Sequence, residues 1–301
     1  MINGIEGFLA DHTMDMAPLK ENGELERIRT TPGSYLGSCR YKLPDSLEDP
    51  VYPKLFQKFQ EMNIGWFFYI GGNDSMDTIK KLSDYAILTG QTQKFLGVPK
   101  TIDNDLALTD HTPGFGSAAK YIGASTKEVI RDALGLTYKK EMITIIEVMG
   151  RTAGHIALWC GISNGSEYVL IPERAEENDE EEIIKKIMSK RRIGKKHHII
   201  VNAEGVGHSH EMAKRIEAAT GIETRATVIG HIQRGGNPSC RDRVYASAMG
   251  ARAVDLLLKG QTNRVVAYKN GEFTDFDIDY ALQMTKDIDE HLYSMTKRLS
   301  R

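Results

Sequence analysis

Short apolar segments rich in β-branched and aromatic residues recur along this chain and alternate with segments whose apolar residues return every three or four positions. The first pattern indicates buried strands and the second indicates amphipathic helices. The expected strands are 66–70, 143–148, 168–171, 198–201 and 227–229. Because strands that alternate with helices usually pair in parallel through helical crossovers, the sequence predicts an α/β protein with mainly parallel sheets.

The segments between these strands carry the helical period. We expect crossover helices at 78–88, 117–134 and 243–258, covering the faces of the sheets. Residues 178–192 begin acidic and end basic, which matches the dipole of a further helix. A chain of 301 residues exceeds the usual size of a single core, so two domains with a cleft between them are expected.

Composition excludes several classes of partner and location. The net charge of −2 gives no general attraction to nucleic acid or to anionic lipid. The cysteines, Cys39, Cys160 and Cys240, form no metal-ligand or redox pair and are expected to be free thiols. The residues after Met1 lack the features of a signal peptide, and no apolar run approaches about 18 residues. A cytoplasmic protein with no membrane partner is expected.

The expected strand 66–70 runs into a glycine-containing loop that consists of Gly71, Gly72, Asn73, Asp74 and Ser75. Glycine allows the backbone to approach a ligand, and the first N–H groups of a helix attract an anion. The loop therefore fits a phosphate site, followed by a helix whose N-cap is Asp74 or Ser75. Asp74 is unusual there because a carboxylate repels phosphate, so it either caps the helix or restricts which donor fits.

A second polar cluster follows Pro99 and consists of Lys100, Thr101, Ile102, Asp103, Asn104 and Asp105. Phosphoryl transfer needs a base for the attacking hydroxyl and cations for the developing charge, and this loop contains candidates for both. Asp103 is the predicted general base. The alternative is a structural turn in which Asp103, Asn104 and Asp105 bond to nearby backbone amides.

Together with residues 147–151 (Glu-Val-Met-Gly-Arg) and 230–236 (Gly-His-Ile-Gln-Arg-Gly-Gly), these two loops resemble the phosphofructokinase family. The resemblance extends from about Gly4 to the C-terminus. It implies two Rossmann-like three-layer α/β/α domains with a cleft between them. Residues 1–114 with 233–286 would bind the phosphoryl donor, and residues 115–232 with 287–301 would bind the sugar phosphate.

The resemblance also implies roles for individual residues. Asp103 would take the proton from the sugar 1-hydroxyl, with Lys100, Thr101 and Arg151 completing the catalytic group. The sugar phosphate would lie against Thr101, Ile102, Asp103, Met149, Gly150, Arg151, Glu204, Arg225, His231 and Arg234. The donor would lie against Gly71, Gly72, Asp74, Ser75, Lys100 and Arg40. Arg225 would reach the sugar phosphate from a neighbouring subunit, which implies a homodimer or homotetramer with active sites at subunit interfaces.

Two positions bear on the donor. Family members that use ATP carry glycine where this chain has Asp74 and Lys100, whereas members that use pyrophosphate carry Asp and Lys. The resemblance thus implies a glycolytic phosphotransferase that converts D-fructose 6-phosphate reversibly to D-fructose 1,6-bisphosphate, with pyrophosphate as donor and Mg²⁺ as cofactor. ATP is the alternative donor. Asn73 stands where many members have a metal-binding aspartate, and Asp105 would support the metal environment.

Other interpretations remain open. The family normally begins with a further strand and a Gly-rich loop ahead of the position matched by Gly4, so an inactive or regulatory truncated chain is a second alternative. An oxidoreductase is disfavoured, because no G-x-G-x-x-G motif follows a strand. His208 and His210 lie in a glycine-rich loop near Glu204 without an evident third ligand, and are expected to be surface residues.

Overall fold

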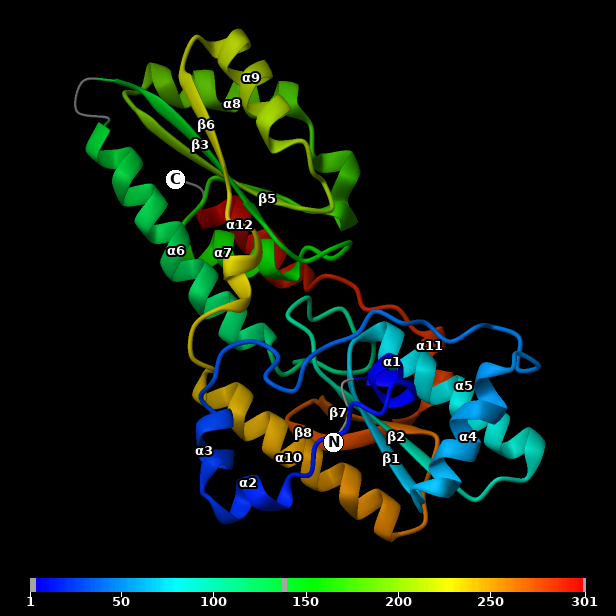
Figure 1. Cartoon of the computed structure of the whole chain (residues 1–301). Helices are drawn as coiled ribbons and strands as arrows, with labels where there is room; N and C mark the ends of the chain where they lie inside the picture. Colours follow the sequence, from blue (N-terminus) through cyan, green and yellow to red (C-terminus); the bar gives the residue numbers. More distant parts are fainter. Residues whose placement is uncertain (1–3, 137–139, 300–301) are drawn as a thin grey trace. The chain divides into compact units, whose positions relative to one another are not determined.

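The computed structural model describes residues 4–136 and 140–299. The chain divides into two compact units, each with its own sheet (Figure 1). Unit 1 comprises Met1–Thr101, Leu106–Gly114 and Asn237–Lys286, and unit 2 comprises Ile102–Asp105, Phe115–Gly236 and Asp287–Arg301. The division differs from the expected domains at 102–105 and 233–236, which lie in unit 2. The chain start at Met1, where no targeting segment was expected, lies outside the described residues.

Unit 1 is built on a four-stranded sheet in the order β1-β2-β7-β8. Its strands are β1 (Trp66–Gly71), β2 (Lys94–Pro99), β7 (Arg264–Lys269) and β8 (Glu272–Asp277). The first three are parallel, and β8 runs antiparallel to β7. Asn270 and Gly271 form the two-residue hairpin between them with φ of 51° and 87°, the left-handed conformation that such a tight turn requires.

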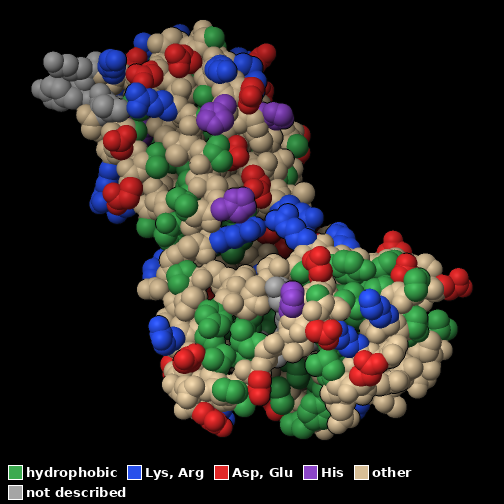
Figure 2. Space-filling view, viewed as in Figure 1, with side chains coloured by type: hydrophobic (Ala, Val, Ile, Leu, Met, Phe, Trp, Pro, Cys, Tyr) green, Lys and Arg blue, Asp and Glu red, His purple; other side chains and the backbone are tan. Residues whose placement is uncertain are grey.

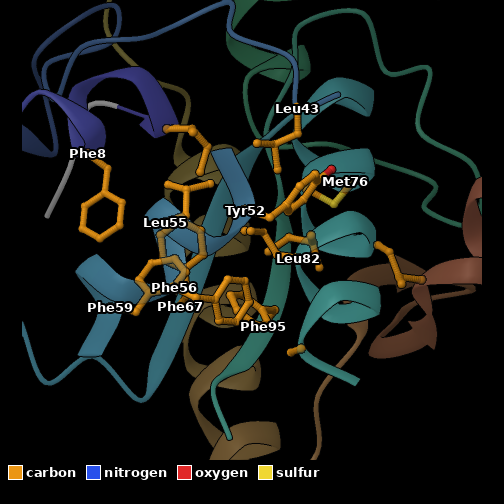
Figure 3. Packing of buried hydrophobic residues seen from close by; sticks show 14 of the residues in the cluster. Phe8, Leu43, Tyr52, Leu55, Phe56, Phe59, Phe67, Met76, Leu82 and Phe95 are labelled. Carbon is orange, nitrogen blue, oxygen red and sulfur yellow. The ribbon is translucent and has the colours of Figure 1, made fainter. Parts of the chain in front are cut away.

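Helices cover both faces of the unit 1 sheet. α4 (Val51–Glu61) and α5 (Asn73–Thr89) pack on one face, where Phe56 and Phe59 meet Phe67 and Phe95 from the strands (Figure 3). α10 (Cys240–Leu258) packs on the other face against alternate strand residues such as Leu96. The shorter helices of this unit are α1 (Gly4–Leu9), α2 (Ala17–Glu21), α3 (Glu24–Ile28) and α11 (Ile278–Gln283).

Unit 2 is built on a second sheet in the order β4-β5-β3-β6, with all strands parallel. Its strands are β3 (Met142–Val148), β4 (Tyr168–Leu170), β5 (His197–Ala203) and β6 (Glu223–Val228). One face packs against α6 (Phe115–Leu136) and α7 (His155–Asn164), with α12 (Glu290–Leu299) against α7. The other face packs against α8 (Glu180–Arg192) and α9 (Ser209–Thr220). Two 3₁₀ helices, η1 (Pro172–Glu177) and η2 (Gly230–Arg234), connect these elements.

The α/β class with mainly parallel sheets is confirmed. The three expected crossover helices fall within α5, α6 and α10, and the charge-patterned segment forms α8 with Asp179 as its N-cap. The strand expected at 227–229 is misplaced, because β6 begins at Glu223 and ends at Val228. Strands β2, β7 and β8 are not among the strands expected from the apolar pattern.

The surface carries charges of both signs. Figure 2 shows acidic and basic side chains interspersed over the visible face. Cys39, Cys160 and Cys240 are free thiols, as expected. Among residues 4–136 and 140–299, no helix combines the length and the apolar character that crossing a membrane requires.

A buried charge cluster lies at the amino end of β4 and β5 in unit 2. The Glu167 side chain is buried, forms an ion pair with Lys195 and hydrogen-bonds His198, whose Nδ1 is 2.7 Å from Glu167 Oε2. Burial alone would raise the pKa of Glu167, but the hydrogen bonds from His198 and Lys195 outweigh it and hold that pKa below its ordinary value. The charged carboxylate is therefore part of the folded state of unit 2.

We expect Glu167→Gln to destabilise unit 2 by about 3–5 kcal/mol near pH 7, because it removes the buried carboxylate that pairs with Lys195. A carboxyl whose pKa is lowered by folding stabilises the protein above its unfolded pKa, and this contribution is lost as pH falls through the folded pKa. The variant should therefore lose less stability than the wild type on acidification below about pH 4.5. Urea unfolding monitored by circular dichroism at several pH values measures both effects. The exposed Glu181→Gln serves as a control, and equal acid sensitivity of wild type and Glu167→Gln would contradict the assignment.

Candidate active site

The carboxyl ends of β1 and β2 lie side by side in unit 1. The strands pair in parallel with Gly71 opposite Pro99, and the Lys100 N–H donates to the Gly71 carbonyl over 2.8 Å. Just beyond, Thr112 Oγ1 donates to the Thr101 carbonyl over 2.9 Å, which fixes the chain where it leaves the sheet. The two loops predicted to hold the donor are therefore neighbours joined by a backbone hydrogen bond.

Gly71 and Gly72 form the turn from β1 into α5. A Cβ on Gly71 would overlap the Ser75 side chain, so this position needs glycine. The helix begins at Asn73 with Gly72 as its N-cap. The predicted cap at Asp74 or Ser75 was wrong, because the extended backbone of Gly72 ends the strand and both residues already lie in the first helical turn.

Asp74 is exposed in the first turn of α5, where the positive end of the helix dipole favours a carboxylate. Its Oδ1 atom lies 2.8 Å from Nζ of Lys42, a residue that the sequence patterns did not single out. Arg40, the predicted donor ligand, is exposed two residues earlier. The carboxylate predicted to discriminate between donors thus has a cation in direct contact.

The segment Ile102–Asp105 packs with unit 2. Ile102 contacts the hydrophobic cluster beneath α6 and α7. Asn104 is 5% exposed and has a φ of 55°, a left-handed conformation that asparagine tolerates better than most residues. Asp103 and Asp105 flank it and are partly buried. The loop is thus fixed at Ile102 and Asn104, while the predicted base Asp103 keeps part of its surface accessible.

In unit 2, the ends of β3 and β5 bring Met149–Arg151 next to Glu204. These strands pair with Val148 opposite Ala203. Glu204 Oε1 accepts hydrogen bonds from the N–H groups of Gly150, at 3.1 Å, and of Arg151. Arg151 has a φ of 56°. A non-glycine residue in this region is strained, and the conformation persists only where the surrounding contacts hold it. Glu204 therefore fixes the turn that presents the exposed Arg151 side chain.

Several residues that support this turn were not predicted from the sequence. The buried Gln233 accepts a hydrogen bond from the Met149 N–H at its Oε1 over 2.9 Å. Ser209 Oγ donates to Glu147 Oε2 over 2.5 Å, and Asn202 Nδ2 donates to Ser209 Oγ over 2.8 Å. The bonds of Gln233 and of Ser209 join residues 84 and 62 positions apart, so no local pattern could have revealed them.

Gly205 allows the Glu204 loop to pack closely against the Arg151 turn. A Cβ at Gly205 would lie 2.5 Å from the Arg151 carbonyl oxygen and 2.6 Å from Cγ of Pro172. We expect Gly205→Ala to destabilise unit 2 by about 1–3 kcal/mol and to raise KM for the sugar substrate, because the turn must shift. Thermal unfolding and steady-state kinetics measure the two effects. Gly135→Ala is the control, since a Cβ there meets nothing within 4 Å; an unchanged KM in Gly205→Ala would contradict the prediction.

His231 and Arg234 lie on η2, which follows β6. A 3₁₀ helix has three residues per turn, so side chains three positions apart project from the same face. Both side chains are exposed, whereas Gln233 between them is buried. The structure thus places the two predicted phosphate ligands on one exposed face.

Arg225 lies on β6, the edge strand of the unit 2 sheet. Its guanidinium donates two hydrogen bonds, of 2.9 and 2.6 Å, to Oε1 of Glu223 on the same strand. The side chain is half-exposed. Its role across a subunit interface stays a prediction.

The residues predicted to bind metal, Asn73 and Asp105, carry oxygen atoms of the kind that Mg²⁺ binds. In the described part of the chain, no three His, Cys, Asp or Glu side chains come together to hold a metal ion. His208 and His210 are exposed, as expected. Asn73 is exposed beside the donor loop and Asp105 is partly buried, and both offer the oxygen ligands that Mg²⁺ prefers. Each residue, taken within its own unit, suits a Mg²⁺ ion that is coordinated mostly by phosphate and water, since Mg²⁺ seldom uses an all-protein cage.

The chain is similar to known proteins over most of its length. The model of the family described as phosphofructokinase matches residues 1–257. ATP-dependent 6-phosphofructokinase 1 from Clostridium perfringens is 42% identical over 254 residues, covering 84% of this chain and 76% of the relative. The ATP-dependent 6-phosphofructokinase of Clostridium acetobutylicum is 41% identical over 269 residues, covering 89% and 80%.

Solved structures add a second set of similar proteins. The pyrophosphate-dependent phosphofructokinase from Marinobacter aquaeolei is 31% identical with a TM-score of 0.85, covering 96% of this chain and 76% of that structure. The enzyme of the same description from Nitrosospira multiformis is 29% identical with a TM-score of 0.84 and the same coverage. The family match spans most of the chain, and the fold agrees with it: this chain belongs to the phosphofructokinase family.

Proposed function

We propose that this chain transfers a phosphoryl group reversibly from pyrophosphate to the 1-hydroxyl of D-fructose 6-phosphate, giving D-fructose 1,6-bisphosphate and phosphate. Family membership supports the sugar substrate and the reaction, a kinase step of glycolysis that takes place in the cytoplasm. One observation carries the choice of donor. The pairing of Gly71 with Pro99 brings the Asp74 and Lys100 loops to the same end of the unit 1 sheet.

The two side chains at this end suit a short donor. The N–H groups at the start of α5 attract one phosphate, while the Asp74 carboxylate in the same turn disfavours the further phosphate that ATP would bring. Lys100 is exposed at the end of β2 and can neutralise the charge that develops on the leaving phosphate. Arg40 supplies a further cation for the donor.

The sugar phosphate binds to unit 2 in this proposal. His231 and Arg234 hold the 6-phosphate, because arginine forms paired charge-assisted hydrogen bonds with phosphate oxygens. Met149, Gly150 and Glu204 bind the sugar, and Arg151 neutralises the migrating phosphoryl group. Arg225 reaches the 6-phosphate of a neighbouring subunit in a homodimer or homotetramer.

The chemical step is an in-line displacement. Asp103 accepts the proton of the sugar 1-hydroxyl while the hydroxyl oxygen forms a bond to one phosphorus atom of pyrophosphate. At the same time, the bond between that phosphorus atom and the bridging oxygen breaks, and phosphate leaves. Thr101 lies beside the transferred group, and Lys100 stabilises the departing phosphate. Mg²⁺, when bound, neutralises charge on the phosphate oxygens, with Asn73 and Asp105 as its protein ligands.

ATP is the second candidate donor, and the curated relatives favour it. The proteins that are 42% and 41% identical to this chain are described as ATP-dependent. The structural neighbours that are pyrophosphate-dependent have lower identity to this chain, 31% and 29%. The donor must therefore be tested directly.

The test is a coupled assay of the purified wild-type chain that detects fructose 1,6-bisphosphate with each donor in turn. We expect turnover with pyrophosphate and at most weak turnover with ATP. The reverse direction, phosphate-dependent consumption of fructose 1,6-bisphosphate, should proceed at a comparable rate. Turnover with ATP alone would contradict the proposed donor, and no turnover with either would favour the inactive-chain alternative.

A further inference from the structure

Lys42 contacts the carboxylate on which the proposed donor choice depends. Its Nζ atom lies 2.8 Å from Asp74 Oδ1, and the two side chains are 62% and 51% exposed. Ion pairs with this exposure contribute little to folding stability. The pair lies at the first turn of α5, directly after the glycine loop that is proposed to bind the phosphoryl donor.

The backbone on the C-terminal side of Lys42 is firmly held. Leu43 is buried in the core cluster of unit 1, where Figure 3 shows it near Tyr52 and Met76. The Leu43 carbonyl accepts a hydrogen bond from Lys81 Nζ over 3.0 Å, and Tyr52 Oη donates to the Pro44 carbonyl over 2.5 Å. The Lys42 side chain therefore starts from a fixed point, so its contact with Asp74 does not depend on a mobile loop.

Residues 40–43 alternate between surface and core. Tyr41 and Leu43 pack against the unit 1 core, whereas Arg40 and Lys42 are exposed. The two side chains that pack on the core thus alternate with the two that are exposed. The segment therefore presents two cations at the surface, and one of them already contacts Asp74.

From this geometry we infer that Lys42 is a donor-selectivity residue: by neutralising the Asp74 carboxylate in direct contact, it limits how strongly that carboxylate rejects ATP. The inference rests on the proposed function for the location of the donor at this loop. An unpaired carboxylate repels a phosphate several ångströms away, and a cation in contact cancels most of that repulsion. Because Lys42 neutralises Asp74, an aspartate at this position excludes ATP less strongly than an unpaired one would. This agrees with the ATP dependence of the relatives that are 42% and 41% identical to the chain.

The experiment is a double-mutant cycle on the full chain, with Lys42→Met, Asp74→Asn and the double variant. The measured quantity is the ratio of kcat/KM with pyrophosphate to kcat/KM with ATP. Lys42→Met should raise this ratio about two- to fivefold, because the unpaired Asp74 disfavours ATP more. In the Asp74→Asn background, the same change should leave the ratio unchanged. Lys42→Arg, which keeps the charge, should retain the wild-type ratio.

Lys185→Met is the matched control, since Lys185 forms an exposed ion pair with Glu181 on α8. It should not alter the ratio. The inference is overturned if the ratio in Lys42→Met is unchanged or lower than in the wild type. It is also overturned if Lys42→Met changes the ratio equally in the wild-type and Asp74→Asn backgrounds. Thermal unfolding of each variant verifies that it is folded.

The wild-type assay alone tests the proposed donor, and the double-mutant cycle tests the role of Lys42. A failure of the proposed function can therefore be distinguished from a failure of the inference. If the wild type uses only ATP, the proposed function fails. The inference then requires that Lys42→Met lowers kcat/KM for ATP in the wild-type chain, and that the same substitution leaves it unchanged in the Asp74→Asn variant. If turnover is absent, calorimetric affinities for imidodiphosphate and for a non-hydrolysable ATP analogue give the same ratio. Absence of binding of both compounds to the wild type overturns the inference as well.

Discussion

Asp103→Asn should lower kcat by about 10²–10⁴-fold, the usual contribution of a positioned general base. Asparagine has nearly the same shape but cannot accept the proton of the sugar 1-hydroxyl. The partly buried loop, fixed by Ile102 and by the left-handed Asn104, should keep its conformation. The affinity for fructose 6-phosphate, measured by calorimetry without a donor, should therefore change little.

The neighbouring Asp105→Asn provides the comparison for this prediction, because it removes a carboxylate from the same loop. If Asp105 binds Mg²⁺, the turnover of Asp105→Asn should recover at higher Mg²⁺ concentration. The turnover of Asp103→Asn should not recover. Near-normal kcat in Asp103→Asn would show that another group takes the proton. A parallel loss of sugar affinity would instead indicate that Asp103 mainly shapes the loop.

Replacing Asp74 and Lys100 together with glycine should shift the donor preference from pyrophosphate towards ATP by about 10²-fold or more. Each substitution removes a charged side chain from the donor loops. A hydrogen bond to a charged group contributes about 1.5–3 kcal/mol to the free energy of an interaction, so each substitution should change the difference between the two donors by about that amount. Removing the Asp74 carboxylate makes room for a longer donor, and removing Lys100 deprives the pyrophosphate leaving group of its cation. Initial rates with each donor at fixed fructose 6-phosphate give the ratio.

The single variants separate the two contributions. Asp74→Gly should mainly raise kcat/KM for ATP, and Lys100→Gly should mainly lower kcat/KM for pyrophosphate. KM for fructose 6-phosphate serves as the internal control, since its predicted ligands His231 and Arg234 lie in unit 2. A double variant whose donor ratio equals that of the wild type would refute the role of these positions.

Local sequence patterns predicted much of the fold. Continuous apolar runs revealed β1 and β3. Strand β3 is buried along nearly its whole length, as such a run predicts. Strand β1 was expected to be buried as well, but it lies at the edge of its sheet, where Trp66 and Ile70 are exposed. Strands β7 and β8 were missed, although Asn270-Gly271 between them is a strong hairpin signal. The N-cap of α5 was misplaced by two or three residues, since glycine competes with aspartate and serine for that position.

The candidate site could be predicted only in part. Motifs identified the residues that we propose contact the substrates, such as Asp103, Arg151 and Arg234, because each motif is short and continuous. The residues that hold them in place were not predicted. The Glu204 contact with Gly150 joins residues 54 positions apart, and Lys42 reaches Asp74 from a segment without regular structure. Such contacts depend on strand order and register, which the sequence alone does not specify.

The division of the chain limits how donor preference can change in evolution. Unit 1 is assembled from Met1–Thr101, Leu106–Gly114 and Asn237–Lys286, and residues of unit 2 separate these segments. No single recombination breakpoint can therefore exchange unit 1 whole, and a crossover within residues 115–236 would join parts of unit 1 from two parents. Substitutions at single codons such as those of Lys42, Asp74 and Lys100 avoid this mismatch. Lineages that acquire a new phosphoryl donor should accordingly differ by scattered point changes rather than by exchanged modules.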